Sequence, residues 1–134
     1  MDFKKLLEEA KLARKNSYSP YSKFAVGAAL ETKDGKVFHG CNVENSSYPL
    51  CMCAERNAIY NAMNHGYKKE DFVALAIIGK TKEPISPCGA CRQVIHELCP
   101  LDMPICLSNL EGDIKETTPR ELLPYAFTGE DLWK

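Results

Sequence analysis

Three cysteines stand where their thiolates could hold one metal ion. Cys88 and Cys91 are separated by two residues at the predicted start of a helix, a spacing at which both sulfurs can bind the same ion. Cys53 stands at a second predicted loop-to-helix junction. The unpaired N–H groups and the dipole of a helix N-terminus stabilise a thiolate, so both junctions favour metal binding. Three thiolates with one open coordination position are typical of catalytic zinc, because structural zinc normally has four protein ligands.

Glu55 is the candidate for proton transfer at this site. It follows Cys53 by two residues, so its carboxylate can face the open coordination position without binding the metal. A carboxylate placed there can take a proton from water activated by the metal and return it to a leaving group. The pattern therefore predicts hydrolysis at a zinc ion, with one zinc per chain.

Arg56 is the candidate that tunes the metal. Three thiolates on one dication leave a net negative charge, which weakens the ability of the metal to acidify water. Arg56 lies in the first turn of the helix that begins near Cys53, where its guanidinium can withdraw charge from the sulfurs. The alternative is a surface arginine on an exposed helix face.

Other interpretations of the cysteines remain open at this stage. A C-x-x-C pair at a helix start also fits a dithiol redox site, and a structural zinc module is a third possibility. Cys53 and Glu55 favour the catalytic site, because a dithiol exchanger needs neither. Cys51 is interpreted as a bystander, with a ligand role as the alternative. The other cysteines are expected to be small buried side chains, and the histidines to be surface or core residues: Cys41, Cys99, Cys106, His39, His65 and His96.

The composition favours one folded domain that spans residues 1–134. Of the 134 residues, 45% are hydrophobic and 26% are charged, as in ordinary globular domains. The 17 basic residues are balanced by 18 acidic ones, so no nucleic-acid partner is expected. No apolar run approaches the roughly 20 residues of a membrane-spanning helix, so no membrane partner is expected. The 7 cysteines and the lack of a secretory signal predict a cytoplasmic protein.

The predicted elements indicate an α/β fold, a three-layer sandwich in which a five-stranded mixed sheet is flanked by helices. About five residues connect the last two strands, too few for a parallel crossover, so these strands should pair antiparallel. Residues 118–121 resemble a capping box with proline at the first helical position. Helices are expected from about 3 to 15, over 53–64 and 88–98, and from 119, with strands over 24–30, 37–44, 72–78, 105–108 and around 114.

With these elements in place, the chain resembles the small, tetrameric cytidine deaminases over nearly its whole length. The blocks that carry the resemblance are moderately specific one by one and highly specific in this order. They include CAER at 53–56 and SPCGACRQ at 86–93, together with 18–24, 26–30, 40–45 and 121–124.

The resemblance implies a function in pyrimidine salvage. Cytidine and 2′-deoxycytidine would be hydrolysed to uridine and 2′-deoxyuridine, with release of ammonia. Zinc on Cys53, Cys88 and Cys91 would carry the hydroxide that attacks C4, and Glu55 would shuttle the proton. Attack at C4 requires protonation of ring atom N3, which one carboxylate can supply before it protonates the departing amine.

The resemblance also implies the substrate contacts. Asn42 and Glu44 are two apart on a predicted strand and share a face, and an amide beside a carboxylate suits a ribose hydroxyl. A polar strand end is the alternative. Phe24 would pack against the pyrimidine ring. Ala54 and Ser86, near the predicted ligands, would offer backbone groups to the base.

Two aromatic residues resemble positions that complete the pocket of a neighbouring subunit, Tyr48 and Phe127. A homotetramer follows from this resemblance. The segment 125–133 places three aromatic side chains in a polar stretch, which suits an interface. Tyr125 departs from the family pattern, where a small residue is usual.

Two other classes of deaminase are alternatives to a cytidine deaminase. Polynucleotide deaminases usually have histidine where Cys53 stands, and they need a positively charged surface to bind the nucleic-acid strand. A deaminase of another aminopyrimidine, such as blasticidin S, is the second alternative. The pair Asn42 and Glu44 favours a ribosyl substrate over it.

Overall fold

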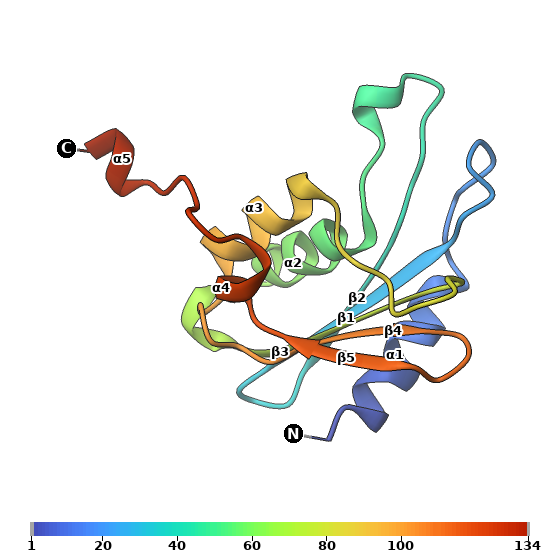
Figure 1. Cartoon of the computed structure of the whole chain (residues 1–134), viewed down its shortest axis with the longest axis horizontal. Helices are drawn as coiled ribbons and strands as arrows, with labels where there is room; N and C mark the ends of the chain where they lie inside the picture. The colour runs from blue at the N-terminus through green and yellow to red at the C-terminus, as the bar shows by residue number, and fades with distance from the viewer. Residues whose placement is uncertain (1, 134) are drawn as a thin grey trace.

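A five-stranded mixed sheet forms the centre of the computed structural model, which describes residues 2–133 and only the backbone of Trp133 (Figure 1). The strand order is β2-β1-β3-β4-β5. β3 and β4 are parallel, and the other neighbours, β4 and β5 among them, are antiparallel, as the short connection predicted. The limits of the predicted domain, Met1 and Lys134, lie outside the described residues. The strands are β1 (Val26–Thr32), β2 (Val37–Cys41), β3 (Phe72–Gly79), β4 (Ile105–Asn109) and β5 (Ile114–Thr117).

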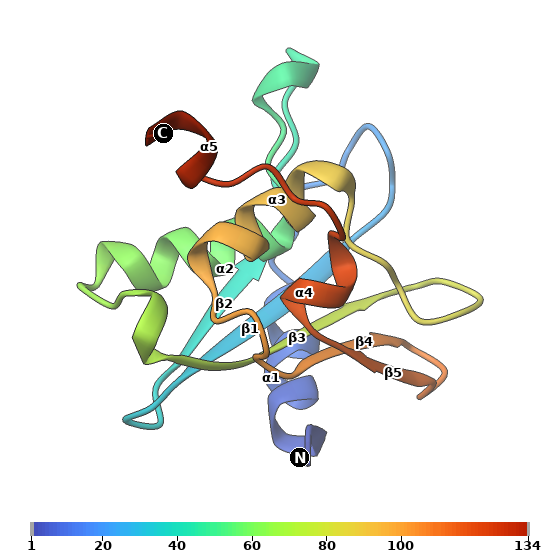
Figure 2. The same ribbon diagram turned by 60° about the vertical axis from the view of Figure 1, so that its left-hand side comes forward.

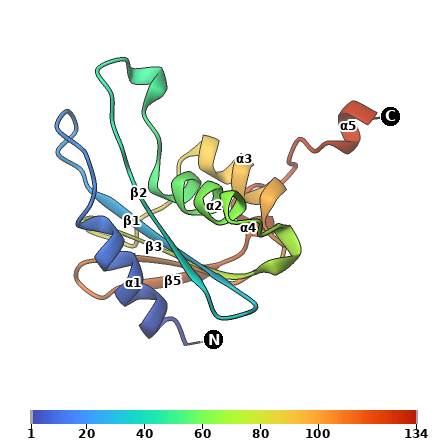
Figure 3. The same ribbon diagram turned by 180° about the vertical axis from the view of Figure 1, so that it is seen from behind.

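Helices cover both faces of the sheet, which confirms the three-layer prediction. α1 (Lys4–Arg14) packs on one face, and α2 (Ala54–Asn64) and α3 (Gly89–Leu98) pack on the other (Figure 3). β3 contributes to both cores, because Leu75 faces α2 and α3 whereas Ala76 faces α1. Alternate side chains of a strand point to opposite faces, so a strand buried on both sides is apolar throughout. Within residues 2–133, no helix has the length and apolar content needed to cross a membrane.

The edges of several predicted elements were wrong. β1 begins at Val26, and β2 ends at Cys41, before the predicted limit of 44. The chain leaves the sheet there because Val43 forms isolated bridges with Tyr18 and Met52. Three short helices carry too few residues for a periodic signal and were not predicted: η1 (Tyr48–Leu50), η2 (Lys69–Asp71) and α5 (Glu130–Trp133).

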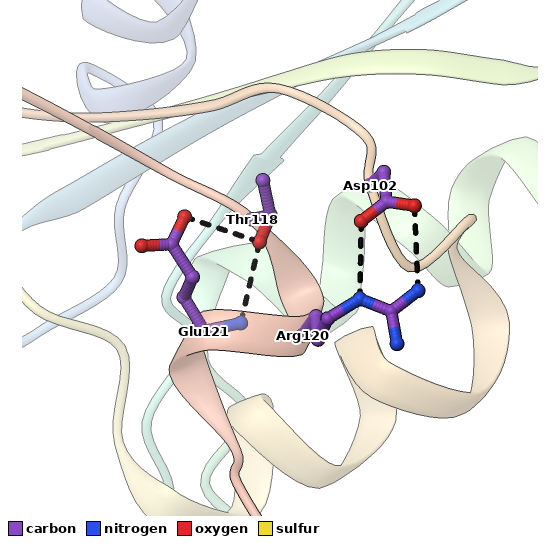
Figure 4. A network of polar contacts seen from close by, with 4 residues as sticks. All are labelled: Asp102, Thr118, Arg120 and Glu121. Atoms are coloured by element: carbon purple, nitrogen blue, oxygen red, sulfur yellow. Dashed lines mark hydrogen bonds and ion pairs between the residues drawn. The ribbon is translucent and has the colours of Figure 1, made fainter.

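The last predicted helix is α4 (Pro119–Leu122), and Thr118 caps it. Figure 4 shows the contacts: the Thr118 Oγ1 atom accepts from the Glu121 N–H at 3.2 Å. The Thr118 hydroxyl also donates to Glu121 Oε1 at 3.3 Å, in place of the carboxylate-to-backbone bond of a full capping box. Arg120 reaches out of this helix to Asp102 with two hydrogen bonds of 3.1 and 3.3 Å.

Gly40 lets β2 and α2 touch backbone to backbone. A Cβ atom on Gly40 would lie 2.2 Å from the Ala54 carbonyl oxygen and 2.3 Å from the Ala58 nitrogen. Backbone atoms cannot move aside as a flexible side chain can, so Gly40→Ala should lower the free energy of unfolding by about 3 kcal/mol, measured by urea denaturation. Gly89→Ala is the control, since a Cβ there meets nothing within 4 Å. Equal stability of the two variants would contradict this close contact.

Candidate metal and catalytic site

The fold brings the three predicted ligands together at the N-termini of α2 and α3. Cys53 and Cys88 are the N-cap residues of these helices, and Cys91 lies in the first turn of α3. All three Sγ atoms lie within 4.8 Å of one another, and those of Cys53 and Cys88 are 3.7 Å apart. Sulfurs that bind one tetrahedral zinc ion at about 2.3 Å are about 3.8 Å apart, so the donor set fits zinc. Within residues 2–133, no other group of three His, Cys, Asp or Glu side chains has such spacing.

The electrostatics of the cluster favour a thiolate at Cys53. Its pKa is lowered to about 5, first by a hydrogen bond from the Cys91 thiol and then by those from Arg56 and Cys88, against the opposing effect of burial. The pKa of Cys91 is raised, because its thiol donates to Cys53 and is buried. Since metal ligands must be deprotonated, a bound dication would favour the thiolate form of all three.

Arg56 contacts the cluster directly, as predicted. Its Nη2 atom donates to the Cys53 Sγ atom at 3.4 Å. Its Nε atom is buried and has no hydrogen-bond partner in the part of the chain that the structure describes. The guanidinium is thus placed to withdraw charge from a ligand sulfur, and the alternative of an exposed surface arginine does not fit.

Glu55 lies beside the cluster and is 5% exposed. Burial is the main cause that raises the pKa of its carboxyl to about 7. A carboxyl that titrates near neutral pH can both accept and donate a proton during one reaction cycle. Position and pKa therefore suit Glu55 for proton transfer.

A pocket of about 270 Å³ joins Glu55 to most of the other predicted site residues. Ser22, Val26 and Ile85 also line it, although the sequence analysis did not single them out. Ser22 and Val26 lie in the blocks 18–24 and 26–30 that carry the resemblance, which was a signal for them, whereas Ile85 looks like an ordinary core residue. The predicted residues that line the pocket are Phe24, Asn42, Glu44, Cys53, Ala54, Glu55, Ser86 and Cys88.

Asn42 lines the pocket from the segment after β2, and its own hydrogen bonds hold the chain around Phe24. The Asn42 Oδ1 atom accepts from the Val26 N–H at 2.9 Å and from the Ser17 hydroxyl at 2.5 Å. The Nδ2 atom donates to the Phe24 carbonyl at 2.7 Å. Asn42 therefore fixes the entry of β1.

Glu44 holds the loop before Phe24 in the same way. Its Oε1 atom accepts from the backbone N–H groups of Tyr21 and Ser22 at 3.0 and 3.1 Å. Its Oε2 atom accepts from the Ser22 hydroxyl, and this bond is the main cause of the lowered pKa of Glu44. The prediction that Asn42 and Glu44 share a strand was wrong, because β2 ends before both, but their side chains do line one pocket.

Tyr48 and Phe127 do not line this pocket within one chain. Tyr48 is 71% exposed on η1, and Phe127 lines a separate pocket of about 550 Å³ beside α3. Cys51 lies outside the thiol cluster, and its sulfur accepts from the Asn45 N–H at 3.3 Å. Cys99 and Cys106 are buried, as expected, whereas Cys41 is only half-buried.

Comparisons with known proteins agree with this geometry. The cytidine and deoxycytidylate deaminase zinc-binding region matches residues 2–107. A cytidine deaminase from Sporosarcina psychrophila is 55% identical over 132 residues, which cover 98% of this chain and 96% of that protein. One from Halalkalibacterium halodurans is 54% identical over 132 residues and covers 98% of both chains.

One solved structure and one more distant relative are also similar to this chain. The crystal structure of cytidine deaminase from Burkholderia pseudomallei superposes with a TM-score of 0.92 at 54% identity, and the match covers 95% of this chain and 100% of that one. A blasticidin-S deaminase from Bacillus cereus is 31% identical over 113 residues, 80% of this chain and 79% of that protein. Three clustered thiols, a buried carboxyl beside them and these matches lead to one conclusion: the chain belongs to the cytidine and deoxycytidylate deaminase family of zinc enzymes.

Proposed function

We propose that this protein converts cytidine and 2′-deoxycytidine to uridine and 2′-deoxyuridine by hydrolysis, with release of ammonia. One observation carries the proposal: the buried carboxyl of Glu55, whose pKa burial raises to about 7, lines a pocket that Cys53 and Cys88 also line. The full-length similarity to proteins named cytidine deaminase supports the same reaction.

The chain's own residues would carry the proton transfers. Cys53, Cys88 and Cys91 would hold zinc, which when bound supplies the Lewis acidity that makes water nucleophilic near neutral pH. Glu55 would take the proton released by that water and give it to ring atom N3, so that C4 can accept the attacking electron pair. The same carboxyl would carry the remaining hydroxyl proton to the amino group, which departs as ammonia while the C4 carbonyl forms.

The remaining pocket residues would orient the nucleoside. Phe24 would pack against the pyrimidine, and the backbone groups at Ala54 and Ser86 would contact the base. Asn42 and Glu44 would face the ribose. Glu44 can do so although it already holds a loop, because a carboxylate has about four lone-pair sites.

Asn42→Asp tests whether this side chain positions Phe24. The change is isosteric, but a carboxylate oxygen would replace the Nδ2 donor and oppose the Phe24 carbonyl. We expect kcat/KM for cytidine to fall about 10- to 100-fold, from one broken hydrogen bond and the repulsion between the two oxygens that replaces it. Steady-state kinetics measure this, with Asn64→Asp at the exposed end of α2 as the control. Equal kinetics for the two variants would contradict the assignment.

We further infer a homotetramer in which neighbouring subunits complete the pockets. The support is the exposure of apolar side chains that a single chain leaves uncovered: Tyr48 is 71%, Leu50 66% and Phe127 57% exposed. Sedimentation analysis of the purified protein tests the oligomer size. A cytoplasmic location belongs to the same proposal, supported by 7 cysteines that are all free thiols. A role in pyrimidine salvage would follow from the proposed reaction.

The deciding experiment is incubation of zinc-replete protein with cytidine, 2′-deoxycytidine and blasticidin S in parallel. Uridine and ammonia should form from cytidine, and a chelator should stop the reaction. Blasticidin S is the second candidate substrate because of the weaker match to a blasticidin-S deaminase. Turnover of blasticidin S without turnover of cytidine would overturn the proposal.

A further inference from the structure

Arg92 ties together three parts of the chain around the pocket. It lies on α3 directly after Cys91. Its Nε atom donates to the Pro87 carbonyl at 2.9 Å, its Nη1 atom to the Leu122 carbonyl at 2.9 Å, and its Nη2 atom to the Ser86 Oγ atom at 2.5 Å. Every nitrogen of the guanidinium therefore has a partner.

One of these partners lines the pocket, and a second leads into the metal cluster. Ser86 lines the pocket, and Pro87 directly precedes the ligand Cys88. Arg92 thus bends back over the start of its own helix and fixes the backbone that leads into the metal cluster.

The third partner, Leu122, is the first residue of the C-terminal segment, which we define as residues 122–127. Leu122 is the last residue of α4, where carbonyl groups need partners from outside the helix. Farther along the segment, the Phe127 carbonyl accepts from the Nε2 atom of Gln93 at 3.0 Å. Two consecutive residues of α3, Arg92 and Gln93, therefore hold both ends of this segment, which runs along α3 in Figure 2.

Arginine suits this position for its shape more than for its charge. Among residues 2–133, the ion pairs are Lys11–Glu8, His39–Glu9 and Arg120–Asp102, and none involves Arg92. A planar fork with donors on three nitrogens can reach acceptors in three directions, which the single ammonium of lysine cannot do.

We propose that Arg92 is a positioning residue for the deamination: it locks Ser86 of the pocket wall, the adjoining Pro87 and the C-terminal segment into one arrangement that admits the nucleoside. The inference rests on the proposed function of this pocket. It assigns Arg92 an effect on substrate binding, exerted through Ser86 and Pro87.

Arg92→Lys tests this role by keeping the charge and losing the fork. We expect KM for cytidine to rise about tenfold, as for one lost hydrogen bond from a charged donor, with kcat within about threefold of the parent value and zinc content unchanged. Arg120→Lys is the matched control, because Arg120 bonds Asp102 away from the pocket (Figure 4). An unchanged KM in Arg92→Lys, or an equal rise in Arg120→Lys, would overturn the proposal.

Amide hydrogen exchange tests the coupling without reference to activity. In Arg92→Lys, the amides of Ser86 and Cys88 and those of residues 123–127 other than Pro124 should lose protection together, and in Arg120→Lys they should not. Unchanged protection of both segments in Arg92→Lys would overturn the role of Arg92. Absence of cytidine turnover by the parent protein would contradict the proposed function alone, because the exchange result would still decide the role of Arg92.

Discussion

Replacing Glu55 by glutamine should lower kcat for cytidine deamination by about 10⁴-fold, at the upper end of the effect of a general acid–base group. Glutamine has the shape of the protonated carboxyl but cannot carry a proton between water, N3 and the amino group. Zinc content should stay at one ion per chain, because Glu55 is not among the three clustered ligands. The measurements are steady-state kinetics and metal analysis of the same preparation.

Glu111→Gln, in the exposed turn between β4 and β5, is the control and should keep the parental rate. A structural zinc module or a dithiol redox protein would be indifferent to the Glu55 substitution. Retention of more than about a tenth of the parental rate by Glu55→Gln would remove this carboxyl from the proton-transfer steps.

The same substitution has a second expected effect, on the stability of the metal-free protein. The pKa of Glu55 is about 7 in the folded chain and near its ordinary value of 4.5 in the unfolded chain. Neutral Glu55 therefore contributes stability that is fully present below pH 4.5 and is lost as the pH rises to 7. Glutamine stays neutral at every pH. The free energy of unfolding of Glu55→Gln should therefore rise relative to that of the parent between pH 4.5 and 7, and the difference should reach about 3 kcal/mol above pH 7. Urea denaturation at several pH values measures this difference, and a pH-independent difference would contradict it.

Replacing Cys53 by alanine should abolish both zinc retention and deamination. The thiol of Cys53 is one of the three clustered ligands, and Arg56 donates its hydrogen bond to this sulfur. Loss of one thiolate should weaken zinc binding by at least about a hundredfold. Metal analysis after dialysis, followed by the cytidine assay with added zinc, measures both losses.

Cys51→Ala is the matched control, since it removes a thiol only two residues away that lies outside the cluster. It should keep zinc and the parental rate. Equal loss of zinc in both variants would mean that Cys51 shares the metal, contrary to the geometry.

Local patterns in the sequence were sufficient to predict the five strands, the helices α1 to α4 and part of the site, but not the ends of every element. Apolar residues at helical spacing predicted α1, and the continuous apolar run at 72–78 predicted a strand covered on both faces. The spacing of Cys88 and Cys91 is itself local, because one helical start positions both thiols. The short connection between the last two strands was enough to predict their antiparallel pairing.

Contacts between distant segments could not be derived from local pattern. The sequence predicted a strand over 37–44 that includes Asn42 and Glu44, whereas the bridges of Val43 to Tyr18 and Met52 take the chain out of the sheet. Roles for Tyr48 and Phe127 stay predictions, because the partner surfaces that would surround them belong to another chain.

By itself, the sequence determined which residues could carry the chemistry, since thiolates at helix starts and a nearby carboxylate have few other uses together. Only the tertiary structure decided that the Sγ atoms of Cys53 and Cys88 lie 3.7 Å apart. It also decided that Arg92 donates hydrogen bonds to Ser86, Pro87 and Leu122. Residue type and short-range spacing determine local conformation and intrinsic reactivity. Proximity between segments far apart in the chain depends on how the helices pack on the sheet, and no local window of sequence contains that information.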